Sequence, residues 1–381
     1  MDRNESLIRE RKLRGWSQRD VASKIGTLEK TVSAWERKER IPGPHFQEKL
    51  CQLFGKDAEE LGFLQPRTQI LTAHALPDAT SESLEDAESI INLSWEAWFS
   101  SKPKQALAET LKVLPRLERI RHSPAAQLHI LYAQTLAIRA HGLLGTIYLD
   151  SLQNDTALHH YKQAQALASE IHDTNQSVTY LALIGDVLRR KDEKNKAIQH
   201  MELAQANAVH DHAERSTHGH VLQILAYTYA DTNDEPSFER AISEATDLLA
   251  HTGEGLDATQ KEFIPFEVLE IRGKANRDLG KPLQAIPYLE QAEKSLQNQI
   301  VTPRWRALLE ISRAQAFCDA GDMTVGVELA MHGLLMAQSV NSPRQMNRVK
   351  KLARKLESSG YKDDRHVRDL KELIHEVYLR E

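Results

Sequence analysis

Apolar residues recur at helical spacing along nearly the whole chain of 381 residues, and no segment shows the strict alternation of a β-strand. The first 64 residues contain five short helical segments, the last of them at 58–64, separated by glycines and prolines such as Gly15 and Pro42. Residues 65–81 lose the periodicity and contain two prolines, so we interpret them as a linker. From residue 82 the helical pattern continues to the end. The pattern predicts an all-α protein with a small N-terminal head and a long helical body.

The helical body repeats itself at a near-constant interval. Small residues at matching offsets, with a large apolar residue between them, allow two antiparallel helices to approach closely. Two looser copies are Ala226, Phe238, Ile242, Ala245 and Ala314, Gly326, Ala330, Gly333. The three good copies are Gly145, Ala157, Tyr161, Ala164, then Gly185, Ala197, Met201, Ala204, and finally Gly273, Ala285, Leu289, Ala292.

This spacing resembles the tetratricopeptide repeat (TPR), most closely in the first copy, where Leu144 and Tyr148 also occupy expected positions. The copies begin 40 to 47 residues apart, which exceeds the standard period of about 34 and implies longer helices or loops. Phe238 occupies a position that normally takes alanine. The resemblance implies a TPR-type α-solenoid over residues 82–342. Residues 343–381 contain two amphipathic helices and are interpreted as the capping helices that a solenoid requires.

Charge and composition narrow the class of protein. Residues 1–50 hold 12 Lys/Arg against 8 Asp/Glu, a net charge of +4, whereas the whole chain carries −5. A basic head on an acidic body is typical of a nucleic-acid reader joined to a second module. No window approaches 18 consecutive apolar residues, and the charged N-terminus lacks the apolar core of a secretory signal. With only Cys51 and Cys318, which predict reduced thiols, we expect a cytoplasmic protein.

The stretch from Ser17 to Glu36 (SQRDVASKIGTLEKTVSAWE) resembles the Xre/λ-repressor-like helix-turn-helix family. Ala22 is small where two helices cross, and Gly26 permits the turn between them. The resemblance implies a five-helix DNA-binding head over residues 1–64, in which the second helix of the motif enters the major groove. It places base contacts at Glu29, Lys30, Ser33 and Ala34. The predicted phosphate contacts are Arg11, Gln18, Arg19, Arg37, Lys38 and Arg40.

In a TPR solenoid, the first helix of each hairpin lines a concave groove. Arginine, amide and tyrosine side chains on that face suit a peptide, because amides pair with its backbone and arginine binds its carboxylate. The alternative is that these polar residues only solvate an empty surface. The predicted effector groove consists of Arg139, Thr146, Asp150, Asp186, Arg189, Arg190, His220, Gln223, Tyr227, Lys274, Arg277 and Gln315, with Glu267 and Asp278 nearby.

Catalytic and metal-binding signals are weak. The sequence has no P-loop, zinc-protease or serine-hydrolase motif, which argues against an enzyme and predicts no cofactor. Seventeen histidines include His210 and His212, but side chains two residues apart on a helix diverge by about 200°. No metal site is predicted.

A helix-turn-helix head joined to a TPR body resembles the peptide-responsive regulators of Gram-positive bacteria (the RRNPP class), which act in quorum sensing. The resemblance implies a homodimeric, sequence-specific transcriptional regulator that binds double-stranded DNA at a palindromic operator and senses a peptide or protein in its groove. The alternative is a TPR interaction scaffold whose head binds DNA weakly or no longer binds it.

Overall fold

The computed structural model describes residues 4–25, 27, 29–38, 42, 44–56, 58, 60–63, 79–252, 255–256, 262–296 and 303–379. The chain divides into two compact units, Met1–Leu76 and Pro77–Glu381, which are described separately. The division falls within the segment that we interpreted as a linker. The first helix of the second unit begins inside that segment, at Ala79.

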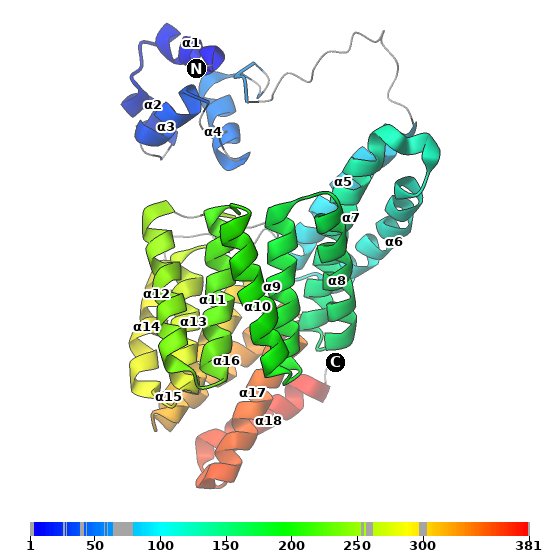
Figure 1. The fold of residues 1–381 in the computed structure, drawn as a ribbon. Helices are drawn as coiled ribbons and strands as arrows, with labels where there is room; N and C mark the ends of the chain where they lie inside the picture. Colours follow the sequence, from blue (N-terminus) through cyan, green and yellow to red (C-terminus); the bar gives the residue numbers. More distant parts are fainter. Residues whose placement is uncertain are drawn as a thin grey trace. The chain divides into compact units, whose positions relative to one another are not determined.

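The head contains α1 (Glu5–Leu13), α2 (Gln18–Ile25), α3 (Glu29–Glu36) and α4 (Pro44–Phe54) (Figure 1). A capping box begins α2, because the backbone N–H of Ser17 donates to the Asp20 carboxylate at 2.7 Å and the Asp20 N–H donates to Ser17 Oγ at 3.1 Å. The core of the head is built from apolar side chains of all four helices, including Leu7, Val21, Ala22, Val32, Trp35, Leu50 and Phe54.

The predicted fifth helix over residues 58–64 is wrong for the part of that segment that the structure describes. Ala58 and residues 60–62 form turns, and Gly62 has a φ of +70°. The Phe63 N–H donates to the Ala58 carbonyl at 2.9 Å, and the Leu61 carbonyl accepts from the Asn4 side chain at 2.9 Å. The apolar spacing that predicted a helix therefore serves a buried turn, in which Leu61 and Phe63 pack into the core of the head.

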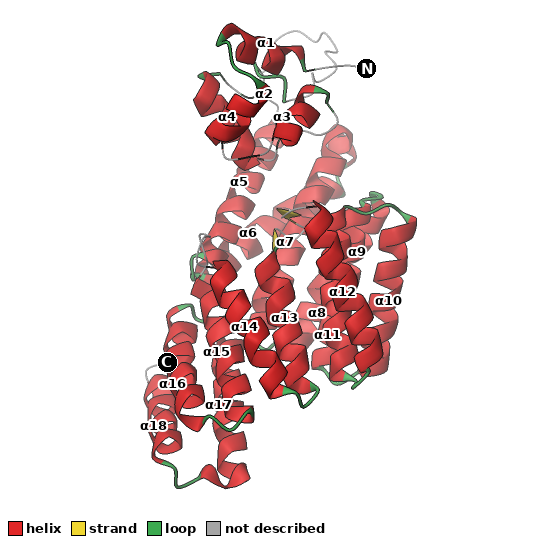
Figure 2. Ribbon diagram, turned by 90° about the vertical axis from the view of Figure 1, so that its left-hand side faces the viewer, coloured by secondary structure: helices red, strands yellow, loops and turns green. Residues whose placement is uncertain are grey.

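The body is a stack of helical hairpins that stand side by side (Figures 1 and 2). The hairpins are α5 (Ala79–Phe99) with α6 (Pro103–Arg121), α7 (Ile130–Asp150) with α8 (Asn154–Glu170), α9 (Thr174–Arg190) with α10 (Lys194–His210), α11 (Arg215–Asp231) with α12 (Glu235–Thr252), α13 (Pro265–Asp278) with α14 (Pro282–Leu296), α15 (Pro303–Asp319) with α16 (Met323–Ser339), and α17 (Pro343–Leu356) with α18 (Arg365–Leu379).

Three short elements complete the body. A 3₁₀ turn at Pro124–His129 precedes α7, and a π-helical turn at Glu357–Tyr361 links α17 to α18. The strands β1 (Gly255–Leu256) and β2 (Glu262–Phe263) pair in antiparallel fashion. The all-α prediction is confirmed apart from this short ladder. No helix among the described residues is long and apolar enough to cross a membrane.

The predicted repeat contacts hold each hairpin together. A Cβ atom placed on Gly145 would come within 2.4 Å of the Tyr161 ring, so α7 and α8 approach too closely for any side chain there. A Cβ atom on Gly185 would likewise lie 2.7 Å from the Met201 side chain, and one on Gly273 would lie 2.6 Å from the Leu289 side chain. Each pair is separated by the same offset of 16 residues, so the repeat pattern is confirmed as a helix-crossing pattern.

Two histidines lie between α7 and α8 and make the stability of the body depend on pH. The Nδ1 atoms of His141 and His160 are 2.9 Å apart. Burial, assisted by neighbouring histidines, lowers the pKa of His141 to about 3 and that of His160 to about 4. Both rings stay neutral in the folded chain, whereas the unfolded chain takes up protons near pH 6.5. The body is therefore expected to lose stability as the pH falls below about 6.5, until the folded rings titrate near pH 4 and below.

Thermal unfolding at pH 7.5 and pH 5.0 tests this dependence. The double substitution His141→Leu/His160→Leu is expected to reduce the difference between the two unfolding temperatures. The matched control is His375→Leu, at an exposed position on α18. An equal pH difference in the wild type and the double variant would contradict the assignment to this pair.

Candidate DNA-binding and ligand-binding sites

The four predicted base-contacting residues share one outward face of α3. Val32 and Trp35 pack into the core of the head, with exposed fractions of 0% and 4%. The helical period then directs the other side of α3 away from the core. Glu29 and Lys30 are exposed, while Ser33 and Ala34 are partly exposed.

The buried carboxylate of Glu36 organises the head. Arg11 Nη2 donates to Glu36 Oε2 at 2.9 Å and its Nη1 donates to the Trp16 carbonyl at 2.9 Å. Gln18 Nε2 donates to Glu36 Oε2 at 2.8 Å, so one carboxylate joins α1, α2 and α3. The hydrogen bond to Glu36 raises the pKa of Arg11. This arrangement directs Arg11 and Gln18 inward, toward positions that fix the angle between the helices.

The remaining predicted phosphate contacts are at the surface where the structure describes them. Arg19, Arg37 and Lys38 are exposed, and Lys38 lies in the turn after α3 with a φ of 55°. Arg40 lies outside the described residues. Phosphate binding by this set remains a prediction.

A cavity of about 230 Å³ occupies the concave side of the body. Its lining comes from the odd-numbered helices α5 to α17, together with Tyr161 of α8. A neighbouring cavity of about 370 Å³ shares part of this lining and adds Arg277 and Gln315. The predicted groove residues that line the first cavity are Thr146, Asp150, Asp186, Arg189, Arg190, His220, Gln223, Tyr227 and Lys274.

Arg139 is the predicted groove residue that lines neither cavity. Its Nη1 atom lies 3.5 Å from Glu88 Oε1, and its Nη2 donates to the Asn92 side chain. Both partners belong to α5, so Arg139 joins the opening hairpin to α7 instead of facing the cavities.

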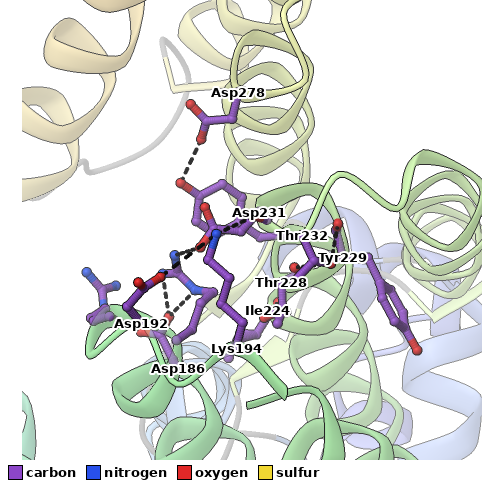
Figure 3. Close-up of polar contacts among 12 residues, drawn as sticks. Asp186, Asp192, Lys194, Ile224, Thr228, Tyr229, Asp231, Thr232 and Asp278 are labelled. Carbon is purple, nitrogen blue, oxygen red and sulfur yellow. Dashed lines mark hydrogen bonds and ion pairs between the residues drawn. The ribbon is translucent and has the colours of Figure 1, made fainter. Parts of the chain in front are cut away.

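A continuous polar network joins the cavity-lining helices α9, α11 and α13 (Figure 3). Arg189 bridges two carboxylates, with Nη2–Asp186 Oδ1 at 2.7 Å and Nη1–Asp231 Oδ2 at 3.1 Å. Arg190 Nε donates to the other oxygen of Asp186 at 2.8 Å. Burial alone would raise the pKa of Asp186, but the two arginines outweigh it and hold that pKa well below its usual range.

Tyr227 continues this network toward α13. Its hydroxyl donates to Asp278 Oδ2 at 2.9 Å. The Arg189 guanidinium lies 4.5 Å from the centre of the Tyr227 ring, and Lys274 Nζ lies 4.0 Å from it. The ring therefore contacts two cations and offers its π-system to each of them.

The two ends of the repeat array meet at Asp150, a contact that the sequence analysis did not find. Arg304 Nη1 donates to Asp150 Oδ2 at 3.1 Å, and Ser342 Oγ donates to Oδ1 at 2.8 Å. Arg304 also lies 3.8 Å from the Trp98 ring centre. These contacts join α5 and α7 to α15 and the start of α17. Arg304 stands ten residues before Ala314, so extending the predicted concave face by one helical turn would have identified it.

Comparison with known families identifies the head. Residues 7–61 match the family model described as helix-turn-helix. This span includes most of α1 and all of α2, α3 and α4. The N-terminal unit is therefore a helix-turn-helix domain, joined to a body of TPR-like helical repeats. A search of curated proteins finds none that matches the chain.

Three solved structures are similar to the chain, and the first of them shares its helical fold. Aspartyl phosphate phosphatase F from Bacillus subtilis is 14% identical over 76% of this chain, with a TM-score of 0.50. The match covers 66% of that protein, just under two thirds of its length. A Rap protein complexed with competence and sporulation factor is 12% identical over 78% of this chain and 92% of its own, with a TM-score of 0.47. Bacillus thuringiensis PlcR, in complex with the peptide PapR7 and DNA, is 13% identical over 77% and 93%, with a TM-score of 0.40.

Proposed function

We propose that the protein is a cytoplasmic, sequence-specific DNA-binding transcriptional regulator whose repeat array binds a peptide or protein effector. The observation that carries this proposal is the outward face of α3 in a head that matches the helix-turn-helix family. A short helix with Glu29, Lys30, Ser33 and Ala34 on its free side fits the major groove, where side chains meet base edges. The proposed role requires no catalytic step.

In this proposal the repeat array binds the effector. Its concave side holds two adjoining cavities lined by polar side chains of several hairpins. A ligand that contacts several hairpins at once favours one superhelical arrangement over another. In a homodimer on a palindromic operator, a change of arrangement would alter the spacing of the two heads and therefore the affinity for DNA.

Binding of the full-length protein to DNA distinguishes a regulator from a scaffold. A regulator is expected to prefer one short palindrome, obtained by selection from random DNA, over scrambled sequences by about 10³-fold or more at physiological salt. Uniform weak binding that moderate salt abolishes would instead favour the scaffold.

Substitutions on and beside α3 separate base reading from backbone attraction. Lys30→Ala is expected to relax the sequence preference, with a loss of about 1–3 kcal/mol that is confined to the selected operator. Arg37→Ala is expected to weaken binding to all sequences and to lower the dependence on salt. Quantitative binding of each variant to operator and scrambled DNA provides the measurement. Equal, sequence-independent losses in the two variants would refute the assignment of Lys30.

A further inference from the structure

The second cavity of the body is lined by cations without an acidic side chain among the described residues that form its wall. Helices α9 and α13 contribute Arg189, Arg190, Lys274 and Arg277. Helix α17, on the opposite side, contributes Arg344, Arg348 and Lys351. Positive charge therefore surrounds a cavity of about 370 Å³.

Carboxylates outside the lining of this cavity neutralise only part of its positive charge. Asp186 pairs with Arg189 and Arg190, and Asp278 pairs with Arg277. Arg344 lies 3.7 Å from Asp150. With Asp231, which also pairs with Arg189, four carboxylates face four of the seven cations.

The other cations have neutral partners or no ion pair. Arg348 donates to the Gln315 side chain at 2.7 Å and to Ser312 Oγ at 2.9 Å, which are neutral acceptors. Lys274 contacts the Tyr227 ring, and neither it nor Lys351 forms an ion pair within the described part of the chain. Burial, with the neighbouring cations, outweighs the opposing effect of the Glu270 carboxylate and lowers the pKa of Lys274 to about 8 and that of Arg348 to about 10. An anion in the cavity would relieve this mutual repulsion.

The first cavity has a mixed wall, which holds apolar rings together with cations and the side chains of four acidic residues. Its apolar part includes Trp98, Phe266 and Trp305, and the last two rings stack with centres 5.5 Å apart. Tyr227 and Lys274 line both cavities, so the two cavities adjoin.

One buried acceptor in the wall of the first cavity indicates the kind of ligand. Gln223 is 1% exposed, and its Nε2 donates to Glu267 Oε2 at 3.1 Å. Its Oε1 atom is buried and has no hydrogen-bond partner among the described residues. A buried acceptor of this kind is costly unless a donor reaches it. The backbone N–H of a peptide is such a donor, because apolar side chains can flank it on both sides.

We propose that the effector is a peptide with an apolar stretch and an acidic end, bound in one direction. Its apolar side chains fill the chamber at Trp98 and Trp305, a backbone N–H donates to Gln223, and its carboxylates enter the cationic chamber between α13 and α17. This inference rests on the proposed function and adds the charge and the direction of the ligand.

Selection from a random heptapeptide library on the full-length protein tests the inference. Peptides with Asp or Glu concentrated at one end and apolar residues at the other are expected to be enriched. A synthetic enriched peptide is expected to bind about tenfold or more weakly to Lys274→Gln and to Lys351→Glu. Lys351 is exposed on α17, so its substitution is not expected to disturb folding. The matched control is Lys162→Gln, an exposed cation on α8 outside both linings.

Three other outcomes would contradict the proposal, each in a different part. Enrichment of neutral or basic peptides would overturn the acidic end and leave peptide sensing in place. A rise in melting temperature with inorganic phosphate or AMP, and with no carboxylate peptide, would show that a phosphate ligand occupies the cationic chamber instead. Failure to enrich any peptide, in a protein that still selects an operator, would overturn the effector part of the proposed function together with this inference.

Discussion

Replacement of Glu36 by alanine is expected to destabilise the helix-turn-helix head by about 3–5 kcal/mol, because the substitution leaves the largely buried guanidinium of Arg11 without its counter-ion. Glu36 is 3% exposed and is the shared partner of Arg11 and Gln18. A small domain is stable by only about 5–15 kcal/mol, so a large fraction of the stability of the head would be lost. Hydrogen exchange of the full-length protein provides the measurement, with loss of amide protection expected across α1 to α4 and unchanged protection in the body. Operator binding is expected to be lost as well.

A paired substitution separates charge balance from packing. Arg11→Met with Glu36→Leu removes both charges and fills the same space with apolar groups, which often preserves stability. This double variant is expected to regain much of the amide protection that Glu36→Ala loses. Normal protection of the head in Glu36→Ala would contradict the structural role of the carboxylate.

The second large effect is expected at Asp150, where the two ends of the array meet. Asp150→Ala leaves Arg304, whose side chain is 10% exposed, without its carboxylate and removes the acceptor of Ser342. Breaking a buried pair of this kind costs about 3–5 kcal/mol. We expect a lower unfolding temperature and faster hydrogen exchange at α5, at the start of α15 and at the start of α17. The effector is also expected to bind more weakly, because α15 and α17 contribute to both cavities.

Asp150→Asn provides the graded comparison. Asparagine keeps an acceptor for Ser342 or Arg304 but removes the charge, so an intermediate loss is expected. Asp155→Ala, at an exposed position on α8 that contacts Lys191, is expected to change stability by less than about 1 kcal/mol. If Asp150→Ala destabilised the protein no more than Asp155→Ala, the stability of the array would not depend on the contacts of Asp150 with Arg304 and Ser342.

Much of the fold follows from local rules that act within one hairpin. Gly145 and Tyr161 are separated by the offset that brings two packed helices together, and the same offset recurs at Gly185 and Gly273. The helix-turn-helix could be predicted because Ala22 and Trp35 occupy positions where the helix crossing dictates residue size. The predicted fifth helix was wrong for the described part of residues 58–64, because apolar spacing over a single helical turn also fits a buried turn. The turn is favoured because Gly62 adopts a positive φ and the Asn4 side chain donates a hydrogen bond to the Leu61 carbonyl.

The lining of the groove was largely predictable, whereas its charge balance was not. Helical offsets placed Arg189, Tyr227 and Lys274 on the concave side because a helix face has a fixed period. The same reasoning did not include α17, for which the repeat pattern offered no reference residue. The cations that α17 adds, Arg344 and Arg348, make the second chamber strongly positive.

The sequence by itself determined the helical class, the repeat, the helix-turn-helix head and most of the concave face, since each depends on residues within about forty positions of one another. The tertiary structure alone decided that Asp150 meets Arg304 and Ser342, across 154 and 192 residues, and that cations of α9, α13 and α17 surround one chamber. The physical reason is that each hairpin adds a small rotation to the stack. The sum of those rotations, which no single repeat encodes, sets which distant side chains face each other.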